Sequence, residues 1–271
     1  MYKKIDRNND VFKTQEFQKD KYKFCIALQN LASDNPIIYS NEKDYFLIRK
    51  DNNLPIWIWT KDNIDISLVK EIEQVIKLFL VNETKDKFTC KKEFYDLLIN
   101  DNFNLLNKED YFEMGILYCK EVKQPKKCDG YMLKADLSDS NILAEFWFQD
   151  NLETGDGLTT IEQSKLDVLK MLEEGNTYIL KNKENKIVCM ARYQVSNDIA
   201  RINHVFTPKE ERGKAYCANL IYNLSNMLLN NNITPMLYTD YNYIPSNKSY
   251  ENVGYKKDGI LISFSCSKEE F

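Results

Sequence analysis

Apolar residues recur at helical spacing in several parts of the chain, most clearly between residues 67 and 80. One face of that segment carries Leu68, Val69, Ile72, Val75, Ile76 and Phe79, and Ser67 is suited to cap its first turn. Similar patterns predict further helices at residues 14–33, 91–100, 138–153, 161–174 and 214–230, and a short one at 246–253. Gly175 follows the segment 161–174 directly, and a glycine in this position favours the end of a helix.

Alternating or continuous apolar runs predict strands between these helices. Residues 45–50 and 54–60 flank a polar turn and predict a β-hairpin. Further strands are predicted at residues 87–90, 111–119, 130–136, 176–182, 186–197, 200–207, 236–240 and 260–266. Each half of the chain thus has the order helix, hairpin, helix, strand, helix, strand. This order predicts an α+β fold with mixed sheets flanked by helices, in two similar halves arranged in tandem.

The stretch 120–130 separates the two halves. It contains a proline, a glycine and several lysines, a composition typical of a link between domains. We therefore expect one domain at residues 1–125 and a second at residues 126–271.

Composition excludes several classes of protein. With 37 basic and 41 acidic residues the net charge is −4, which argues against sequence-independent binding to nucleic acid. No run of 18 apolar residues indicates a membrane span, and the N-terminus has no apolar stretch typical of a signal peptide. The seven cysteines form no closely spaced pair and there is one histidine, so we expect no metal site and a reducing cytoplasm. The many Lys, Asn and Ile residues suggest an AT-rich bacterial genome.

The ten residues TPKEERGKAY, Thr207 to Tyr216, join a predicted strand to a predicted helix. The first N–H groups of a helix have no partner within the helix, and with the helix dipole they favour an anion such as phosphate. Gly213 would let a phosphate approach the backbone, Ala215 keeps the next turn small, and Arg212 and Lys214 supply positive charge. The alternative is a glycine that turns a corner beside solvated charges. The Walker pattern G-x-x-x-x-G-K-[ST] is absent.

In its context this corner resembles a known motif. The segment ARINHVFTPKEERGKAYCANLIYNLSNMLL, from Ala200 to Leu229, is similar to the acyl-CoA-binding motif of the GNAT N-acetyltransferase superfamily. That motif is a strand, then [Q/R]-x-x-G-x-[G/A], then a helix. Residues 212–215 fit it, whereas Glu210 stands where Gln or Arg is usual.

A second segment, Leu237 to Tyr255, resembles a later motif of the same superfamily. Asn247, Tyr250, Gly254 and Tyr255 fit it. The asparagine that usually lies seven residues before the tyrosine would fall at residue 243, and Asn242 lies next to that position. The resemblance covers residues 130–271, and the first half shares only the order of its elements. It implies a degenerate GNAT-like domain in the first half and the acyl-CoA N-acyltransferase fold in the second.

The resemblance implies that acetyl-CoA is the cosubstrate and that no metal is needed. It places the pantetheine arm along the backbone of Val205, Phe206 and Thr207. The remaining contacts with CoA that it implies come from Arg212, Gly213, Lys214, Ala215, Tyr216, Asn242 and Asn247. It gives Tyr250 the role of general acid to the departing thiolate, and a tyrosine that only packs in the core is the alternative.

The general base stays open at the level of sequence. The strand from Ala200 to Thr207 has no carboxylate, so Asn203 is a candidate for positioning a water molecule. His204 would lie on the opposite face of a regular strand, where it is either structural or a base. Glu145 is a further candidate. Beside it Phe146, Trp147 and Phe148 either line an acceptor site or pack in the core.

The corresponding corner of the first half is expected to lack this chemistry. By the eight-residue spacing from the strand end, Ile66 matches Gly213 and would obstruct a phosphate, and Asp62 and Asp65 would repel one. We therefore expect one acetyl-CoA per chain.

Three hypotheses for function follow. The first is an acetyl-CoA-dependent N-acetyltransferase in which an amine attacks the thioester directly in a ternary complex. The second is a catalytically idle acyl-CoA-binding regulatory protein, and the third is a scaffold that binds neither substrate. For the enzyme we expect a cytoplasmic monomer or homodimer that acts on a small-molecule or peptide amine, with no nucleic acid or membrane partner.

Overall fold

The structure of the chain is a computed structural model that describes residues 1–81, 85–154 and 159–268. Its contacts group the chain into two compact units, and we describe each by itself. The first unit comprises residues 1–116, 239–242 and 258–271, and the second comprises residues 117–238 and 243–257. No helix in the described part of the chain is long and apolar enough to span a membrane.

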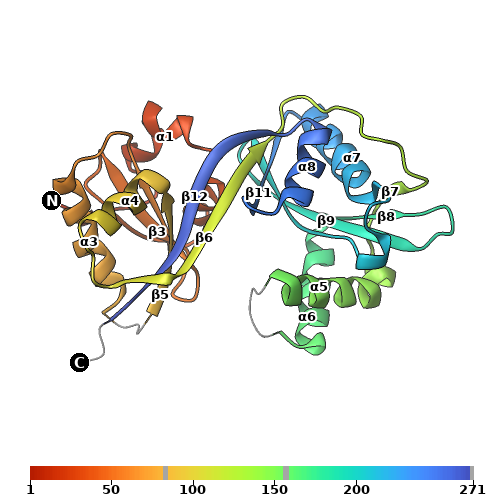
Figure 1. The fold of residues 1–271 in the computed structure, drawn as a ribbon, viewed down its shortest axis with the longest axis horizontal. Coiled ribbons are helices and arrows are strands. Elements are labelled where there is room, and N and C mark those ends of the chain that lie inside the picture. The colour runs from red at the N-terminus through yellow and green to blue at the C-terminus, as the bar shows by residue number, and fades with distance from the viewer. Residues whose placement is uncertain (82–84, 155–158, 269–271) are drawn as a thin grey trace. The chain divides into compact units, whose positions relative to one another are not determined.

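The secondary structure follows the predicted order of helices and strands, with two additional strands before residue 41 that the sequence pattern did not predict (Figure 1). The α-helices are α1 (Gln15–Lys19), α2 (Cys25–Leu31), α3 (Ile66–Phe79), α4 (Lys92–Asn100), α5 (Ser140–Thr154), α6 (Ile161–Glu174), α7 (Tyr216–Asn230) and α8 (Ile244–Val253). Three short 3₁₀ helices are η1 (Asp10–Lys13), η2 (Leu137–Asp139) and η3 (Lys209–Glu211). The strands are β1 (Lys3–Lys4), β2 (Ile37–Ser40), β3 (Tyr45–Arg49), β4 (Ile56–Thr60), β5 (Lys85–Lys91), β6 (Leu106–Tyr118), β7 (Tyr131–Lys134), β8 (Thr177–Lys181), β9 (Ile187–Ser196), β10 (Ile199–Phe206), β11 (Thr234–Asp240) and β12 (Lys256–Ser267).

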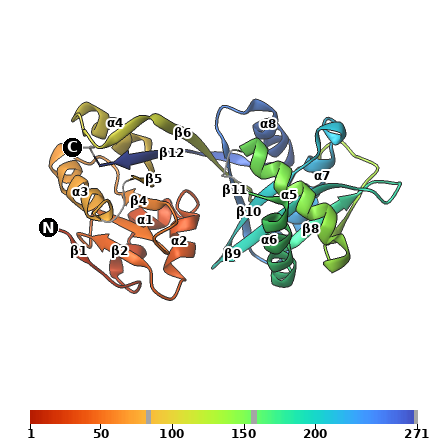
Figure 2. The same ribbon diagram turned by 90° about the horizontal axis from the view of Figure 1, so that it is seen from below.

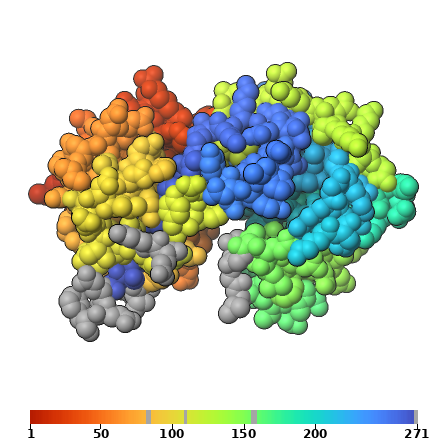
Figure 3. All heavy atoms as spheres, in the orientation of Figure 1, coloured from red at the N-terminus to blue at the C-terminus, as the bar shows by residue number. Residues whose placement is uncertain are grey.

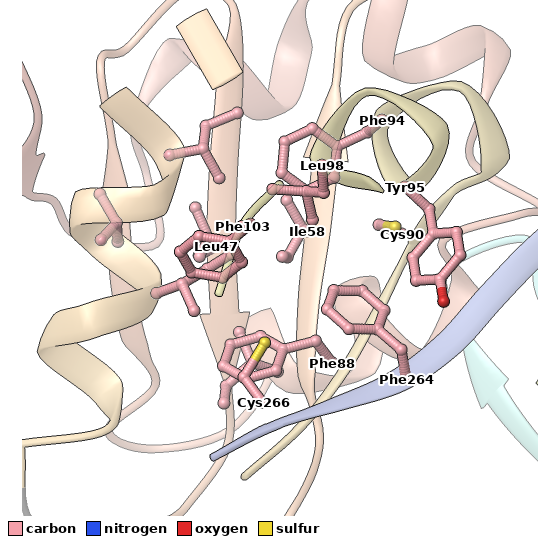
Figure 4. Packing of buried hydrophobic residues seen from close by; sticks show 14 of the residues in the cluster. Leu47, Ile58, Phe88, Cys90, Phe94, Tyr95, Leu98, Phe103, Phe264 and Cys266 are labelled. Carbon is pink, nitrogen blue, oxygen red and sulfur yellow. The ribbon is translucent and has the colours of Figure 1, made fainter. Parts of the chain in front are cut away.

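The first unit is built on strands in the order β1-β2-β3-β4-β5-β12-β6. β3 and β4 form the predicted antiparallel hairpin, whereas β4 and β5 are parallel. Helices α3 and α4 bury their apolar residues against the sheet, and Figure 4 shows Leu47, Ile58, Phe88, Phe94 and Phe264 of this core meeting side by side. The predicted α+β architecture with a mixed sheet is confirmed in this unit.

The second unit has strands in the order β11-β10-β9-β8-β7, with β10 parallel to β11 and the other pairs antiparallel. A register shift in the pairing of β9 with β8, between Cys189 and Ile187, interrupts the alternation of side chains along β9. Val188 and Cys189 lie in the core beneath α7 and α8, whereas Ile187 and Met190 lie in the core beneath α5 and α6. Figure 2 shows α5 and α6 together over β8 and β9. In Figure 3 the atoms of α7 and α8, in cyan and blue, cover part of the second unit.

The chain returns to the first unit at its end. β12 begins at Lys256, and its residues from Leu261 to Ser267 pair antiparallel with β5. Contacts therefore assign residues 258–271 to the first unit, although they follow the second unit in sequence. The division of the chain into domains at residues 1–125 and 126–271 stays a prediction.

Two local details differ from the expectations. The predicted helix at 14–33 is two helices, α1 and α2, separated by turns between residues 20 and 24. The cap of α3 is Asp65 instead of Ser67, and the Asp65 carboxylate accepts a hydrogen bond from the backbone N–H of Leu68 at 2.9 Å. A carboxylate suits this position better than a hydroxyl, because it also interacts favourably with the helix dipole.

Candidate active site

The end of β10 is irregular at the position where the sequence predicts a site. Asn203 lies opposite Arg192 of β9, but Phe206 lies opposite Met190, so β10 has one extra residue between these pairs. His204 has φ of 49°, a conformation that is unusual for a residue other than glycine. This is a β-bulge, which bends a strand and redirects its side chains.

The parallel pairing of β10 with β11 also changes here. It runs from Ile199 opposite Thr234 to Ile202 opposite Leu237, and among the described residues it ends there. The backbone from Asn203 to Phe206 therefore leaves β11 while it still pairs with β9 at Phe206. A strand edge of this kind presents N–H and C=O groups that an extended ligand can pair with.

The three residues at the end of β10 have different surroundings. Val205 packs against the core beneath α7 and α8, and Phe206 is buried in the opposite core, with its ring centroid 5.4 Å from that of Phe146. The Thr207 hydroxyl donates to the thiol sulfur of Cys189 at 3.2 Å. The Thr207 carbonyl accepts from Nε of Arg212 at 2.8 Å. These contacts fix the strand end in place.

The turn from η3 into α7 leaves backbone N–H groups available. Gly213 has φ of 77°, and an added Cβ would meet no described atom within 4 Å. Ala215 precedes α7 with φ of 63°, and in the described chain no side chain caps the helix. The first N–H groups of α7 therefore point outward without a side-chain acceptor, a geometry suited to an anion.

Glu211 is the carboxylate buried in this turn, whereas Glu210 is exposed to solvent. Glu211 accepts from Nζ of Lys186 at 2.7 Å and from Nζ of Lys214 at 2.8 Å. These hydrogen bonds lower the pKa of Glu211. The motif position that departs from the GNAT pattern, Glu210, thus faces water, while its neighbour holds the turn.

The two cations predicted for phosphate binding are both paired with carboxylates. Lys214 binds Glu211, and the guanidinium of Arg212 donates to Glu153 of α5 at 2.6 Å. Both side chains are at least one third exposed, so each can also reach a ligand. An exposed pair of this kind stabilises the protein by at most about 1 kcal/mol, so a ligand can compete for the cation.

Tyr250 lies in α8, buried against the first turn of α7. Burial raises the pKa of its phenol, and the nearby Cys217 raises it further, so the hydroxyl is protonated at neutral pH. Burial also raises the pKa of Cys189, whose thiol hydrogen-bonds to that of Cys217 and lowers the pKa of Cys217. The contacts from Thr207 through Cys189 and Cys217 to Tyr250 thus join β10, β9, α7 and α8.

Helix α8 is positioned by a close backbone approach. It ends at Gly254, which has φ of 109°. An added Cβ there would lie 2.5 Å from the carbonyl oxygen of Glu121. Only glycine fits such a place, which is the physical reason for the glycine of the second motif.

The remaining predicted cofactor residues are not all brought to this turn. Asn247 is buried in α8. The Tyr216 side chain is buried and its hydroxyl donates to Asp129 at 2.9 Å, so it can offer a ligand only its backbone. Asn242 belongs to the first unit by its contacts, and its amide nitrogen lies 3.4 Å from an acceptor oxygen of Glu113.

The candidates for the general base lie in different surroundings. Asn203, with its amide oriented to suit its neighbours, donates to the carbonyl of Arg192 at 3.2 Å and accepts from Arg201 at 3.3 Å. His204 was expected on the other face of the strand from Asn203. The bulge instead sets it against α5, where its ring centroid lies 4.0 Å from that of Trp147. Glu145 is exposed on α5, Phe146 is buried in the core, and Phe148 is half-buried.

In the described residues, no group of three or more His, Cys, Asp or Glu side chains is placed to hold a metal ion.

Comparison with known proteins identifies the architecture. Neither a protein-family model nor a curated protein matches the sequence. An acetyltransferase of the GNAT family from Colwellia psychrerythraea matches with a TM-score of 0.63 and 11% identity, covering 98% of this chain and 100% of that one. A GCN5-related N-acetyltransferase from Sphaerobacter thermophilus matches with a TM-score of 0.64 and 7% identity, over 98% and 95% of the two chains. The chain has the GNAT fold.

The GNAT fold is present in a tandem arrangement. A tandem GNAT protein from the clavulanic acid biosynthesis pathway matches with a TM-score of 0.57 and 7% identity, over 98% of each chain. The predicted resemblance is therefore confirmed for the fold, and it extends over both halves. At these identities the likeness shows the fold alone, so substrate and activity must be argued from the residues of the site.

Several residues of the site were not found from the sequence. Glu211 lies inside the motif, but its spacing gives no sign that it is buried between two lysines. Asp150 lies three residues after Trp147, and only the bulge in β10 brings both to His204. Glu153 follows another three residues on, where the same face of α5 reaches Arg212.

Proposed function

We propose that the chain is an acetyl-CoA-dependent N-acetyltransferase whose reaction takes place in the second unit. The observation that carries this proposal is the uncapped start of α7, which directly follows the bulged end of β10 and lies beside Tyr250. Acetyl-CoA has three chemical parts that match these features: a pyrophosphate, an extended pantetheine arm with amide groups, and a thioester.

The pyrophosphate would bind at the turn before α7. The N–H groups from Gly213 to Cys217 would donate to its oxygens, and the helix dipole would add favourable electrostatics. Arg212 and Lys214 would exchange part of their contact with Glu153 and Glu211 for contact with phosphate. The open side of Gly213 supports this arrangement, because no described atom occupies it.

The pantetheine arm would extend along β10. Its amides would pair with the backbone of Val205 to Thr207, where β10 has left β11. This pairing would bring the thioester carbonyl near the bulge, where a backbone N–H can stabilise the negative charge that develops as the amine adds. Asn247 of α8 remains a proposed contact to CoA, and Asn242 would contribute only if its side chain left Glu113.

A protonated amine loses two protons in the reaction, one before it attacks and one as the amide forms, and the departing sulfur gains one. An amine with a pKa of about 10.4 must lose a proton before it attacks, which costs roughly 4–5 kcal/mol at pH 7. The departing thiolate gains a proton from Tyr250, whose raised pKa keeps the hydroxyl protonated. We propose direct attack in a ternary complex, with a small-molecule or peptide amine as the acceptor.

A second candidate is an idle acyl-CoA-binding regulatory protein. The absence of a carboxylate on the strand from Ala200 to Thr207 favours it, because binding of acyl-CoA needs no general base whereas acetyl transfer does. A third candidate, a scaffold that binds neither substrate, conflicts with the uncapped start of α7. Isothermal titration with acetyl-CoA separates the third from the other two, and we expect one molecule bound per chain.

Release of free thiol from acetyl-CoA, measured with a panel of primary amines, separates the enzyme from the idle binder. We expect Tyr250→Phe to lower kcat about 100-fold while acetyl-CoA affinity stays within about twofold of wild type. Tyr222→Phe, a half-buried tyrosine of α7, is the matched control and should leave the rate unchanged. Equal activity of Tyr250→Phe and wild type would remove Tyr250 from the mechanism.

A further inference from the structure

His204 is the residue that the bulge of β10 moves to the other side of the strand. In a regular strand it would lie on the same face as Ile202, beneath α7 and α8. With φ of 49° and one extra residue in β10, it lies instead against α5. A non-glycine residue in this conformation is strained, so the surrounding contacts must compensate for it.

The contacts of His204 on α5 are a ring and a carboxylate. The Trp147 ring is inclined at 39° to the imidazole, with the centroids 4.0 Å apart. Nδ1 of His204 lies 3.7 Å from Oδ2 of Asp150. The His204 side chain is still 29% exposed and that of Asp150 is 17% exposed. Asp150 therefore faces Nδ1 of the imidazole from beyond hydrogen-bond distance, and the ring is partly accessible.

We propose that His204 is the general base of acetyl transfer and that Asp150 is its positioning residue. The inference rests on the proposed function and deepens it by naming the group that accepts the proton of the acceptor amine. Asp150 favours the tautomer that carries hydrogen on Nδ1, which leaves the lone pair of Nε2 for the amine. His204 directly precedes Val205, where the strand edge proposed for pantetheine continues.

The step balances with the groups present. The amine nitrogen forms a bond to the thioester carbonyl carbon, and its proton passes to Nε2 of His204. The carbon–sulfur bond then breaks, and the departing sulfur takes the proton of the Tyr250 hydroxyl. His204 afterwards returns its proton through solvent and Tyr250 regains one, so no net charge accumulates on the protein.

The charged groups around His204 are largely occupied with other partners. On β9, Arg192 pairs with Glu174, and on β10, Arg201 donates to Gln194. Glu153 of α5 pairs with Arg212 and Lys209. Tyr250 of α8 is protonated, and the field of Asp150 contributes to the rise of its pKa. Asp150 thus lies near both proposed catalytic residues.

The chain offers an unusually direct test, because His204 is its single histidine. A selectively labelled protein gives one imidazole resonance, which reports the pKa of His204 without assignment. His204→Asn is the variant of choice, since asparagine tolerates the left-handed backbone conformation. Thermal shift with acetyl-CoA shows that each variant is folded and binds.

Thiol release from acetyl-CoA is then measured against pH with benzylamine, spermidine and a dipeptide as acceptors. We expect His204→Asn to lower kcat/KM about 100-fold and to change the acid limb of the wild-type profile. Asp150→Asn should lower kcat/KM about tenfold and change the nitrogen chemical shifts of the His204 imidazole, because the carboxylate favours the tautomer with hydrogen on Nδ1. Asp167→Asn, a half-buried aspartate of α6, should change neither quantity.

The outcomes separate this inference from the proposed function. If wild type is active and His204→Asn has activity within about twofold of it, with the same pH profile, the role of His204 is overturned and the proposed function stands. A loss of activity in Asp150→Asn without any change in the nitrogen chemical shifts of the His204 imidazole would overturn the positioning role. Wild type that releases no thiol with any of the amines would overturn both.

Discussion

Each unit contains a corner, by which we mean the turn that leads from a strand into a helix. The two corners connect their elements in the same way but differ in the features that a ligand would contact. In the first unit β4, parallel to β5, leads to α3. In the second β10, parallel to β11, leads to α7. The pairing of β4 with β3 is continuous to Thr60, whereas the pairing of β10 with β9 is interrupted by the bulge.

The first turns of the two helices differ in whether a side chain caps them. Asp65 caps α3 with its own carboxylate, whereas in the described structure no side chain caps α7. Ile66, expected to obstruct a phosphate, is the first residue of α3 and 45% exposed. The cap therefore offers a more direct reason for a lack of acetyl-CoA binding in the first unit.

The space beyond the parallel strands of the first unit is filled by charged and aromatic side chains. Nζ of Lys91 lies 2.6 Å from Oδ2 of Asp20, and Nε1 of Trp59 donates to the same oxygen at 3.0 Å. Trp59 is fully buried. The comparison teaches that one fold can either satisfy its polar groups internally or leave them for a ligand. Only the second arrangement makes a binding site.

The largest effect on this comparison is expected from Asp20→Asn. It leaves the buried Lys91 with the exposed Asp62 as its remaining carboxylate partner, and we expect the unfolding free energy to fall by about 3–5 kcal/mol. Urea denaturation measures this. Burial raises the pKa of Asp20, but hydrogen bonds led by that from Lys91 outweigh it, so the net pKa is lowered. The stabilisation is therefore present above the unfolded-state pKa and is lost as pH falls through the folded-state pKa.

Asp62→Asn is the matched control, since Asp62 also binds Lys91 but its side chain is 80% exposed. We expect it to cost at most about 1 kcal/mol. Unchanged stability of Asp20→Asn together with altered acetyl-CoA affinity would contradict a purely structural role for this cluster.

A smaller loss of stability is expected in the second corner from Glu211→Gln, about 1.5–3 kcal/mol at neutral pH. The hydrogen bonds from Lys186 and Lys214 lower the pKa of Glu211. Their stabilisation is present above the unfolded-state pKa and disappears as pH falls through the lowered one. The unfolding free energies of wild type and Glu211→Gln, measured by urea denaturation, should become equal in acid. Lys214 is released in this variant, so titration calorimetry should show tighter acetyl-CoA binding at low salt.

Ala215→Asp places a carboxylate at the start of α7, as Asp65 does at the start of α3. Aspartate tolerates a positive φ, so we expect the fold to remain stable. The added charge at the start of α7 should weaken acetyl-CoA binding about tenfold, close to 1.4 kcal/mol. Ala215→Asn is the neutral control in titration calorimetry. Equal affinities of the two variants would show that phosphate does not bind there.

The smallest effect is expected from removing the cap of the first corner. Asp65→Ala should lower the unfolding free energy by about 1 kcal/mol. Ser67→Ala should cost less, because the Ser67 hydroxyl only donates to Asp65. We expect titration to show one acetyl-CoA per chain in both variants, since the cluster of Asp20, Lys91 and Trp59 remains. A second binding event in Asp65→Ala would show that the cap alone keeps the first unit empty.

Local sequence determined much of this protein. Helical and alternating patterns predicted the order of elements, and Gly175 ends α6 with φ of 70° as expected. The predicted corner from Thr207 to Tyr216 is present with Gly213 in a positive-φ conformation. These features depend on residues close in the chain, where backbone preference and side-chain periodicity decide the outcome.

Tertiary structure decided what the sequence left open. A bulge is set by register against a neighbouring strand, so sequence could not show that His204 turns toward Trp147 and Asp150. Burial of Glu211 between Lys186 and Lys214 depends on a residue 25 positions away. The pairing of β12 with β5 joins residues at least 170 positions apart. Contacts between distant residues are fixed only when the core packs, because their energy does not reside in any local pattern.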